Sequence, residues 1–286
     1  FFYDTGNSIN IRTDNTKRNI IIKYNSFYYC NNLAAGQRTV FVYGKFNLEI
    51  AYNCFHNCTC DQGCISYNTE YDTSSTTLLD KNTFNTNGGK RHSVYLGRLK
   101  VKNQNNFQYN NFTASNSYDV FGTVFLELCE IIERFNTYAD CVSLLCILGH
   151  ASTISDNHGL VFVNNTVLTA NAPGAVLLKC FNHYKIASGM FITNLTFAYF
   201  YGNTLGNNIY NVYVSSLYAN QYVPLHNSSS QILYISDCYA DNFTSSCTMT
   251  QYHTISGTAS TGLTQAGVPL YTVTSTKTCY LEPPNE

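Results

Sequence analysis

The stretch Asn25-Ser26-Phe27 has three close counterparts along the chain: Asn53-Cys54-Phe55, Asn82-Thr83-Phe84 and Asn110-Asn111-Phe112. The phenylalanines of the four phrases therefore recur at a nearly constant interval along the sequence. Weaker echoes continue to Phe243, eight intervals after Phe27, which gives a mean period of 27. A fixed period of this length indicates a repeat architecture in which each unit stacks on the one before it.

A second phrase, a short apolar run, follows a similar period. Its best examples are Thr39-Val40-Phe41-Val42, Ser93-Val94-Tyr95-Leu96, Thr123-Val124-Phe125-Leu126 and Ala175-Val176-Leu177-Leu178. These runs are rich in β-branched and aromatic residues and are bounded by Gly, Asn or Asp, which predicts strands. Helical signals are nearly absent, since the one candidate, residues 126–135, fits two strands equally well.

Short strands at a fixed period, without helices to cross over, predict an all-β fold: a right-handed parallel β-helix of about nine turns stacked roughly 4.8 Å apart. A pair of β-sandwiches is the alternative. Asparagine tolerates the left-handed backbone angles of a corner, and stacked asparagine amides can form a hydrogen-bonded ladder. The aromatic residue two positions later is then expected to point inward and stack with its equivalents.

The pattern divides the chain into three parts. Residues 1–18 lack a full repeat, so we expect a cap or an exchange segment that reaches a neighbouring molecule. Residues 19–247 carry the repeat and form the predicted solenoid. Residues 248–286 are rich in Thr, Ser and Gly and are typical of a C-terminal segment or stalk.

Composition excludes several classes of protein. The chain of 286 residues has 16 basic and 17 acidic residues, and only 12% of its residues are charged, about half the usual share. A nucleic-acid-binding protein needs a basic surface to neutralise phosphates, and this chain does not supply one. No apolar run approaches the roughly 18–20 residues of a membrane span. Polarity comes instead from amides and hydroxyls, with 35 asparagines.

Cysteines and glycosylation sequons indicate the secretory pathway and an extracellular or cell-surface location. The chain has 12 cysteines. Six Asn-X-Ser/Thr sequons begin at Asn57, Asn111, Asn164, Asn194, Asn227 and Asn242. The candidates for disulfides are Cys54, Cys58, Cys60, Cys64, Cys141, Cys146, Cys238 and Cys247. The last two pairs in this set are each close enough in sequence to bridge locally, but spacing does not fix the pairing.

The cluster from Cys54 to Cys64 also permits a zinc interpretation, since four thiolates can close a tetrahedral site. The cluster lacks the usual CX2C knuckles, however, and His56 confuses the ligand count. We therefore favour disulfides and predict neither a metal nor a cofactor.

The Asn-X-Phe phrases at residues 25–27, 53–55 and 82–84 resemble the β-helix repeats of polymorphic-membrane-protein-like and pectate-lyase-like surface proteins. The match is to the Asn- and Cys-rich versions of protists such as trichomonads, and it covers roughly residues 19–247. This resemblance implies an adhesive or structural protein of the cell surface, often followed by a membrane anchor. The Gly-Gly-Ala-Ile phrase typical of the family is absent here, and Gly174-Ala175-Val176 is only similar.

Many parallel β-helices cleave acidic polysaccharides, so we consider a catalytic site as the alternative. The candidates are Asp140, Asp156, His158 and Lys185. Lys185 follows His158 by one period of the repeat, so the two can be neighbours. The spacing between Asp140 and Asp156 is not a whole turn, and a hydrolase needs its two carboxylates about 5–9 Å apart.

The remaining acidic cluster, Glu127, Glu130 and Glu133, is interpreted as part of a solvated face. The sequence thus favours an extracellular structural or adhesive glycoprotein that is not an enzyme. It is expected to self-associate into oligomers or head-to-tail filaments, and a glycan is a further expected ligand. Binding or cleavage of a polysaccharide is the alternative.

Overall fold

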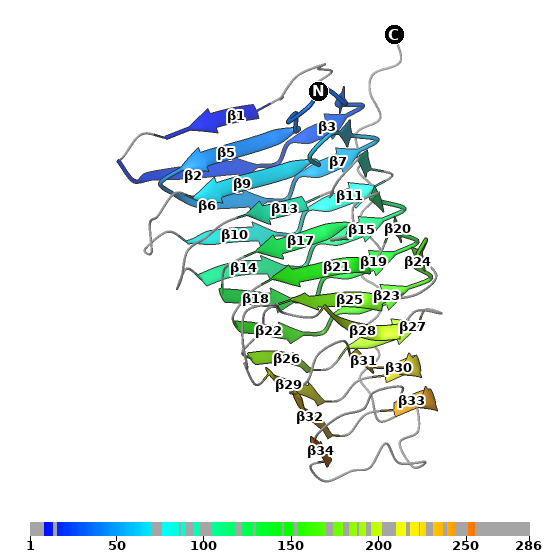
Figure 1. Cartoon of the computed structure of the whole chain (residues 1–286). Coiled ribbons are helices and arrows are strands. Elements are labelled where there is room, and N and C mark those ends of the chain that lie inside the picture. Colours follow the sequence, from blue (N-terminus) through cyan, green and yellow to red (C-terminus); the bar gives the residue numbers. More distant parts are fainter. Residues whose placement is uncertain are drawn as a thin grey trace.

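The computed structural model describes residues 9–13, 16–69, 76–85, 87–89, 94–97, 104–117, 122–127, 130–144, 146–151, 154–169, 174–179, 183–187, 189–192, 196–201, 210–215, 218–222, 224–226, 231–236, 239–243 and 251–254. Strands form a parallel β-helix throughout these residues, and no helix occurs among them. Figure 1 shows successive strands stacked along the axis of the coil, in chain order.

Three long parallel sheets make the walls of the coil. The first sheet contains β1 (Ile9–Arg12), β5 (Val40–Gly44), β9 (Ile65–Thr69), β13 (Val94–Gly97), β17 (Val124–Glu127), β21 (Cys146–Ala151), β25 (Gly174–Lys179), β28 (Thr196–Tyr201) and β31 (Pro224–His226). The second sheet contains β2 (Arg18–Lys23), β6 (Phe46–Ala51), β10 (Thr77–Asp80), β14 (Gln104–Gln108), β18 (Glu130–Arg134), β22 (Ile154–His158), β26 (His183–Ala187), β29 (Tyr210–Ser215), β32 (Gln231–Ser236) and β34 (Gln251–Thr254).

The third sheet follows a sharp corner and contains β3 (Ser26–Tyr28), β7 (Cys54–His56), β11 (Thr83–Asn85), β15 (Asn111–Thr113), β19 (Thr137–Ala139), β23 (Val161–Val163), β27 (Met190–Ile192), β30 (Tyr218–Tyr222) and β33 (Tyr239–Phe243). Two small sheets follow a second corner. They contain β4 (Asn31–Asn32), β8 (Thr59–Cys60) and β12 (Gly88–Gly89), and β16 (Asn116–Ser117), β20 (Val142–Ser143) and β24 (Thr166–Val167).

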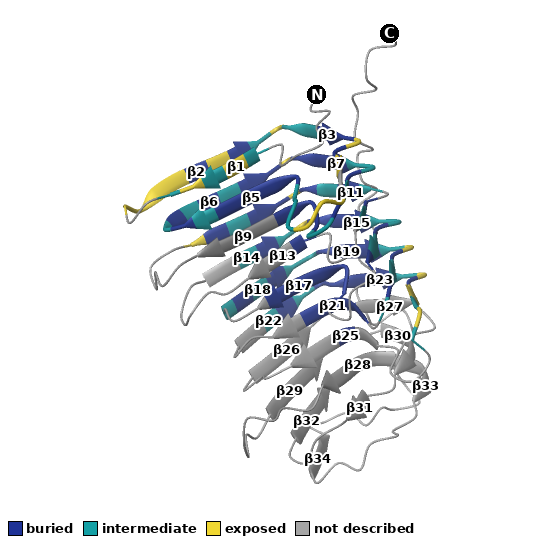
Figure 2. Ribbon diagram, turned by 45° about the horizontal axis from the view of Figure 1, so that its top comes forward, coloured by how far each residue is buried: buried dark blue, intermediate teal, exposed yellow. Residues whose placement is uncertain are grey.

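The predicted aromatic column fills the core. Successive rings stack face to face, with centroids 4.4–5.2 Å apart, along Phe27, Phe55, Phe84, Phe112, Tyr138 and Phe162. All six rings are fully buried. Side chains alternate sides along a strand, so the residues before and after each ring point outward. Figure 2 shows the contrast between this buried interior and the exposed first strand of the second sheet, β2.

The predicted asparagine ladder is also present, at the corner between the second and third sheets. The side-chain amide of Asn53 donates to Asn82 Oδ1 at 3.0 Å, and that of Asn82 donates to Asn110 Oδ1 at 2.9 Å. Asn25 and Asn136 extend the ladder at its two ends. Each acceptor oxygen also receives the backbone N–H of the asparagine in the preceding turn. The buried amides therefore find all their hydrogen-bond partners only when the asparagines of consecutive turns lie directly above one another.

The expectation that asparagine takes the left-handed angles at this corner is wrong. Positive φ belongs to the residue before each ladder asparagine: Tyr24, Tyr52, Lys81, Tyr109 and Phe135, at 52–60°. Their side chains point outside the coil, where a large side chain does not collide with the core. The corner therefore accepts residue types that rarely adopt a left-handed backbone. At the second corner, Asn57 and Asn164 do take positive φ.

A second ladder at that second corner mixes residue types. Its buried members are Cys30, Cys58, Asn87, Ser115, Cys141 and Asn165. Asn87 and Asn165 accept the backbone N–H of Cys58 and Cys141 at 2.8 and 2.9 Å. The thiols of Cys58 and Cys141 donate to backbone carbonyls of the preceding turn at 3.4 and 3.6 Å, as the amides do at equivalent positions.

We predict that Asn82→Ala lowers the free energy of unfolding by roughly 3 kcal/mol, because it removes four hydrogen bonds from buried partners. Urea denaturation followed by circular dichroism measures the change. Asn47→Ala is the matched control, since the three hydrogen bonds of the Asn47 side chain are exposed outside the coil and their loss costs about 0.5 kcal/mol. Equal losses for both variants would contradict the role of the ladder.

Candidate binding face on the second sheet

The outward face of the second sheet carries a shallow groove with a volume of about 360 Å³. It crosses β2, β6, β10 and β14. Its outward-facing lining includes Asn19, Ile21, Asn47, Glu49, Thr76 and Leu78. We refer to these six residues as the groove residues.

One side of the groove is a column of amides and hydroxyls. The Asn47 amide donates to Asn19 Oδ1 at 2.9 Å. Asn47 Oδ1 accepts the backbone N–H of Thr76 at 3.2 Å and lies 3.3 Å from its hydroxyl. The adjacent column is apolar at two places, Ile21, which is 65% exposed, and Leu78. The groove therefore offers neutral hydrogen-bonding groups beside apolar carbon.

Three ion pairs lie along this outer face. Lys23 contacts Glu49 at 2.7 Å, Lys81 contacts Asp80 at 3.6 Å, and Arg134 contacts Asp156 at 2.8 Å. The hydrogen bond from Lys23 to Glu49 raises the pKa of that lysine, and the hydrogen bond to Tyr52 raises the pKa of Lys81. Because each cation in these pairs meets an anion, the pairs add no net charge that would attract a charged partner.

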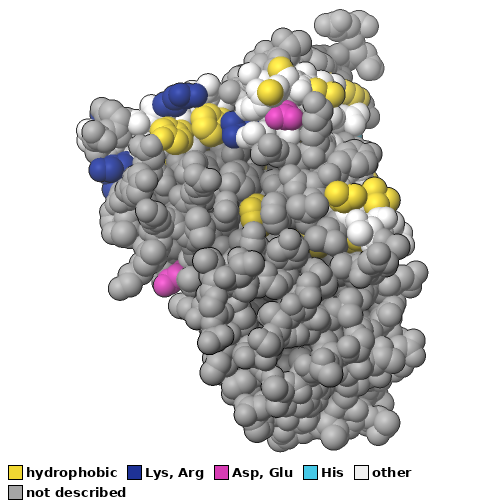
Figure 3. Space-filling view, in the orientation of Figure 1, with side chains coloured by type: hydrophobic (Ala, Val, Ile, Leu, Met, Phe, Trp, Pro, Cys, Tyr) yellow, Lys and Arg dark blue, Asp and Glu magenta, His cyan; other side chains and the backbone are white. Residues whose placement is uncertain are grey.

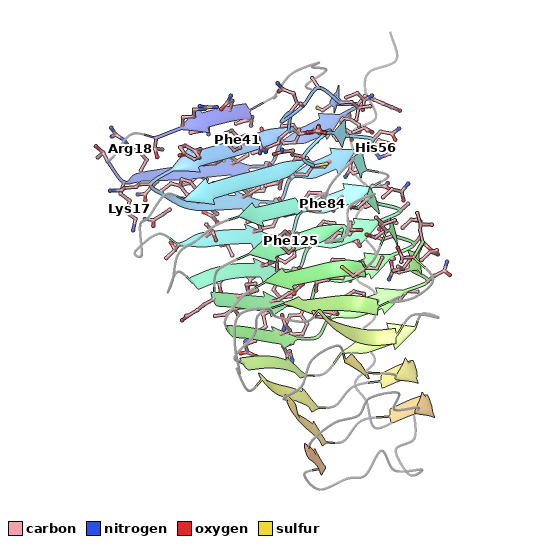
Figure 4. All side chains as sticks on the ribbon, in the orientation of Figure 1. Lys17, Arg18, Phe41, His56, Phe84 and Phe125 are labelled. Carbon is pink, nitrogen blue, oxygen red and sulfur yellow. The ribbon has the colours of Figure 1, made fainter. Side chains whose placement is uncertain are left out.

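Other described basic side chains gather beside the first strands. Lys17 and Arg18 point outward at the bend between β1 and β2 (Figure 4). Figure 3 shows basic side chains near the same end of the molecule. Arg12 and Arg38 lie over the ring of Phe41, at 5.7 and 4.4 Å from its centroid.

A ribbon of outward side chains, four aromatic and one lysine, borders the face. It consists of the five outward residues of the first corner: Tyr24, Tyr52, Lys81, Tyr109 and Phe135. Tyr24 stacks on Tyr52 at 5.1 Å, and Tyr109 stacks on Phe135 at 5.1 Å. The Lys81 ammonium lies between the two stacks, 5.0 Å from Tyr52 and 5.7 Å from Tyr109. The faces of these rings are therefore covered by the neighbouring rings of the ribbon. Tyr24, which is 75% exposed, is the first ring of the stack.

The catalytic candidates do not form one site. Asp156 and His158 lie on β22 in the second sheet. Asp140 lies at the second corner after β19, where its carboxylate accepts the Asn164 amide at 2.6 Å. Lys185 does not pair with His158 as the period predicts: it pairs in register with Asp156, and Ala187 pairs with His158. Asp156 itself is held by Arg134, and His158 packs edge-on against Phe135.

The interpretation of Glu133 as part of a solvated face is wrong, because its side chain is fully buried. Glu133 Oε1 accepts the Asn136 amide at 2.9 Å and the Tyr138 hydroxyl at 2.6 Å. The reason lies one turn on, where Leu160 follows the positive-φ corner residue Gly159. Leu160 has no amide to continue the ladder. The carboxylate of Glu133 therefore accepts the hydrogen bond from the Asn136 amide that the next ladder asparagine would otherwise accept. Sequence reasoning missed this cluster. Two residues together could have indicated it: Leu160, which stands where the ladder needs an asparagine, and Tyr138, which stands in the phenylalanine column and brings a hydroxyl into the core.

Five of the predicted disulfide cysteines are reduced. Cys58, Cys60, Cys64, Cys141 and Cys146 are buried outside any disulfide, as is Cys30. The local bridge from Cys141 to Cys146 is not formed, because Cys141 is a ladder residue and Cys146 begins β21. Burial raises the pKa of the Cys141 thiol to about 12 and raises that of Cys64. Cys54 differs: it is in a disulfide. Cys238 and Cys247 lie outside the described residues.

The sequons fall in different environments. Asn111 is 8% exposed and lies within β15, where a glycan has little room. Asn57 and Asn164 lie at the second corner, and Asn164 is exposed. Asn242 lies in β33. Asn194 and Asn227 lie outside the described residues.

Comparisons with family models, curated proteins and solved structures give no match. In the described part of the chain, no helix is long and apolar enough to cross a membrane. Within the same residues, no group of three or more His, Cys, Asp and Glu side chains is arranged to hold a metal ion. The groove and its bordering ribbon are the features on which a functional proposal can be built.

We predict that Glu133→Leu destabilises the chain by roughly 2–4 kcal/mol, because the Asn136 amide and the Tyr138 hydroxyl both lose a buried acceptor. Glu133→Gln keeps a carbonyl oxygen and should cost less, about 1 kcal/mol. Urea midpoints of the two variants provide the measurement. A Glu133→Leu variant as stable as the native chain would show that the carboxylate does not end the ladder.

Proposed function

We propose that this chain is an extracellular, non-catalytic adhesive protein that binds a neutral polysaccharide along the outer face of its second sheet. The observation that supports the proposal most directly is the groove across β2, β6, β10 and β14. Its chemistry is that of a sugar site, in which hydroxyls meet amides while the carbon face of a ring lies on apolar side chains.

The charge pattern favours a neutral ligand. Glu49, the one carboxylate among the groove residues, is paired with Lys23 at 2.7 Å. An acidic polysaccharide would need cations directed into the groove. The cations of the three ion pairs on this face are instead each in contact with a carboxylate. Neutral hydroxyls suit the amide column better.

The repeat of the coil suits a linear polymer. Groove side chains recur once per turn, with the roughly 4.8 Å spacing of adjacent strands. A sugar ring in an extended chain is about as long as a turn is high, so successive sugars can meet equivalent residues in successive turns. The exposed tyrosines contribute their edges and hydroxyls, because their faces already stack on one another.

The same proposal includes the finer features expected from the sequence. We propose that the coil has about nine turns and is right-handed, and this hand agrees with the strong preference of parallel strand connections. Secretion and glycosylation are supported by the sequons at the second corner, where Asn164 is exposed and Asn57 is half-buried.

We predict that Ile21→Arg weakens binding to neutral polysaccharides at least tenfold, because a cation would stand in the groove over the apolar strip. Affinity electrophoresis through gels containing a panel of neutral and acidic polysaccharides measures the effect. Leu33→Arg is the matched control, since Leu33 is 50% exposed and lies outside the groove. Retardation by none of the neutral polymers, or equal retardation of both variants, would overturn the proposal.

Head-to-tail assembly is a second proposal, supported by the strand order at the start of the coil. β1, β2 and β3 are the outermost strands of the three long sheets. Three aligned sheet edges can continue into a second copy, and a low charge does not oppose that contact.

Electron microscopy at rising protein concentration tests this assembly, and we expect filaments whose length grows with concentration. Sedimentation as one monomeric species over the same concentration range would exclude it. This result is independent of the gel assay.

A further inference from the structure

Cys54 is chemically distinct from the other described cysteines, because it is in a disulfide while the other six are reduced. It opens β7, one residue before the inward ring of Phe55. Alternation along the strand turns the Cys54 side chain to the outer face of the third sheet. The partner sulfur therefore lies outside the coil.

The partner can be identified by elimination. Removing Cys54 and the six reduced cysteines from the 12 of the sequence leaves five: Cys129, Cys180, Cys238, Cys247 and Cys279. A disulfide requires the two Cα atoms to lie within about 7 Å. Strand order along the coil decides which of the five can meet this limit.

Two candidates are too far along the axis. Cys129 lies between β17 and β18. The turn that contains Cys54 has β5 and β6 in the same two sheets, and β17 and β18 are each three strands further along their sheet. Three strand spacings are about 14 Å. Cys180 follows β25 directly, five positions beyond β5, which is about 24 Å.

Two more candidates belong to the far end of the coil. Cys238 directly precedes β33, seven positions beyond β7, or about 34 Å away. Cys247 is four residues from both Phe243 and Gln251, which end β33 and begin β34. Four extended residues span at most about 14 Å, so Cys247 cannot reach Cys54.

Only Cys279 remains, and its tether is long enough. The whole stretch 255–278 separates it from Thr254, the last residue of β34. An extended chain of that length spans roughly 80 Å, more than the distance back to β7.

A second observation is independent of the cysteine count. The outward column at the start of the third-sheet strands is largely buried: Cys54 is 9% exposed, Asn111 8%, Thr137 3% and Val161 3%, with Thr83 half-buried among them. The outward column of the second sheet, by contrast, includes Ile21 at 65%. Outward side chains of a β-helix wall can be this buried only where further chain lies over them.

We propose that residues 255–286 return along the outer face of the third sheet and that Cys279 forms a disulfide with Cys54. The bond forms as the two thiols lose two protons and two electrons to a disulfide-bearing oxidant, which becomes two thiols. The returning segment covers the outward column at the start of the third-sheet strands and leaves the second sheet as the open face. This proposal does not depend on polysaccharide binding.

The native protein, expressed through a secretory pathway, is alkylated with N-ethylmaleimide, digested without reduction and analysed by mass spectrometry. We expect a linked peptide pair containing Cys54 and Cys279 that separates on reduction. A link from Cys54 to any other cysteine, or alkylation of Cys54, overturns the proposal.

Variants test the covering role. Cys279→Ser should make Cys54 reactive toward N-ethylmaleimide and should increase proteolytic cleavage within residues 255–286. Cys247→Ser is the matched control and should change neither. Equal effects of the two variants, or no effect of Cys279→Ser, would contradict the returning segment.

Discussion

The structure depends on the need of a buried amide for four hydrogen-bond partners. An asparagine side chain inside the coil has two N–H groups and an acceptor oxygen, and water cannot reach them. Asn82 meets this need by donating to Ile50 O and Asn110 Oδ1 and by accepting twice from Asn53. A shift of one turn by a single residue would leave these groups unsatisfied at a cost of several kcal/mol. The ladder therefore fixes the register, and the register places each phenylalanine over the next.

Departures from the ladder follow the same requirement. At the second corner, Cys58 and Cys141 take asparagine positions because a thiol can donate to the same kind of backbone carbonyl. At the first corner, the ladder stops at Asn136, and Glu133 supplies the acceptor that Leu160 lacks. These positions explain why cysteines that are close in sequence remain reduced and why one glutamate lies in the apolar core.

Much of the fold could be predicted from the sequence, because the ladder and the ring column involve single residue types at a constant interval. The Asn-X-Phe phrase carries both signals, but the mean period alone did not give the local register, since Lys185 pairs with Asp156 and not with His158. Other features could not be predicted. Tyrosine and lysine with left-handed backbone at the corner contradict their general preferences, and only the outward direction of their side chains makes the corner tolerant. Glu133 could not be placed without knowing that Leu160 occupies the next ladder position. The groove required the register of four strands.

The three walls of the coil differ in what they can do. The first carries arginines over Phe41, the second carries the neutral groove and its aromatic border, and the third has a largely buried outward column at the start of its strands. A binding role thus falls to the second wall, which combines exposure, periodic amides and compensated charge.

Hydrogen exchange of the corner backbone amides tests the central claim most directly. The N–H groups of Asn25, Asn53, Asn82 and Asn110 each donate to the side chain of the next turn at 2.7–3.1 Å. Two-dimensional NMR during exchange into D2O should find the amides of Asn53, Asn82 and Asn110 protected as strongly as strand amides of β6 and β10. Exchange of these corner amides within seconds, at the rate of exposed turns, would mean that the amide ladder does not hold the coil together.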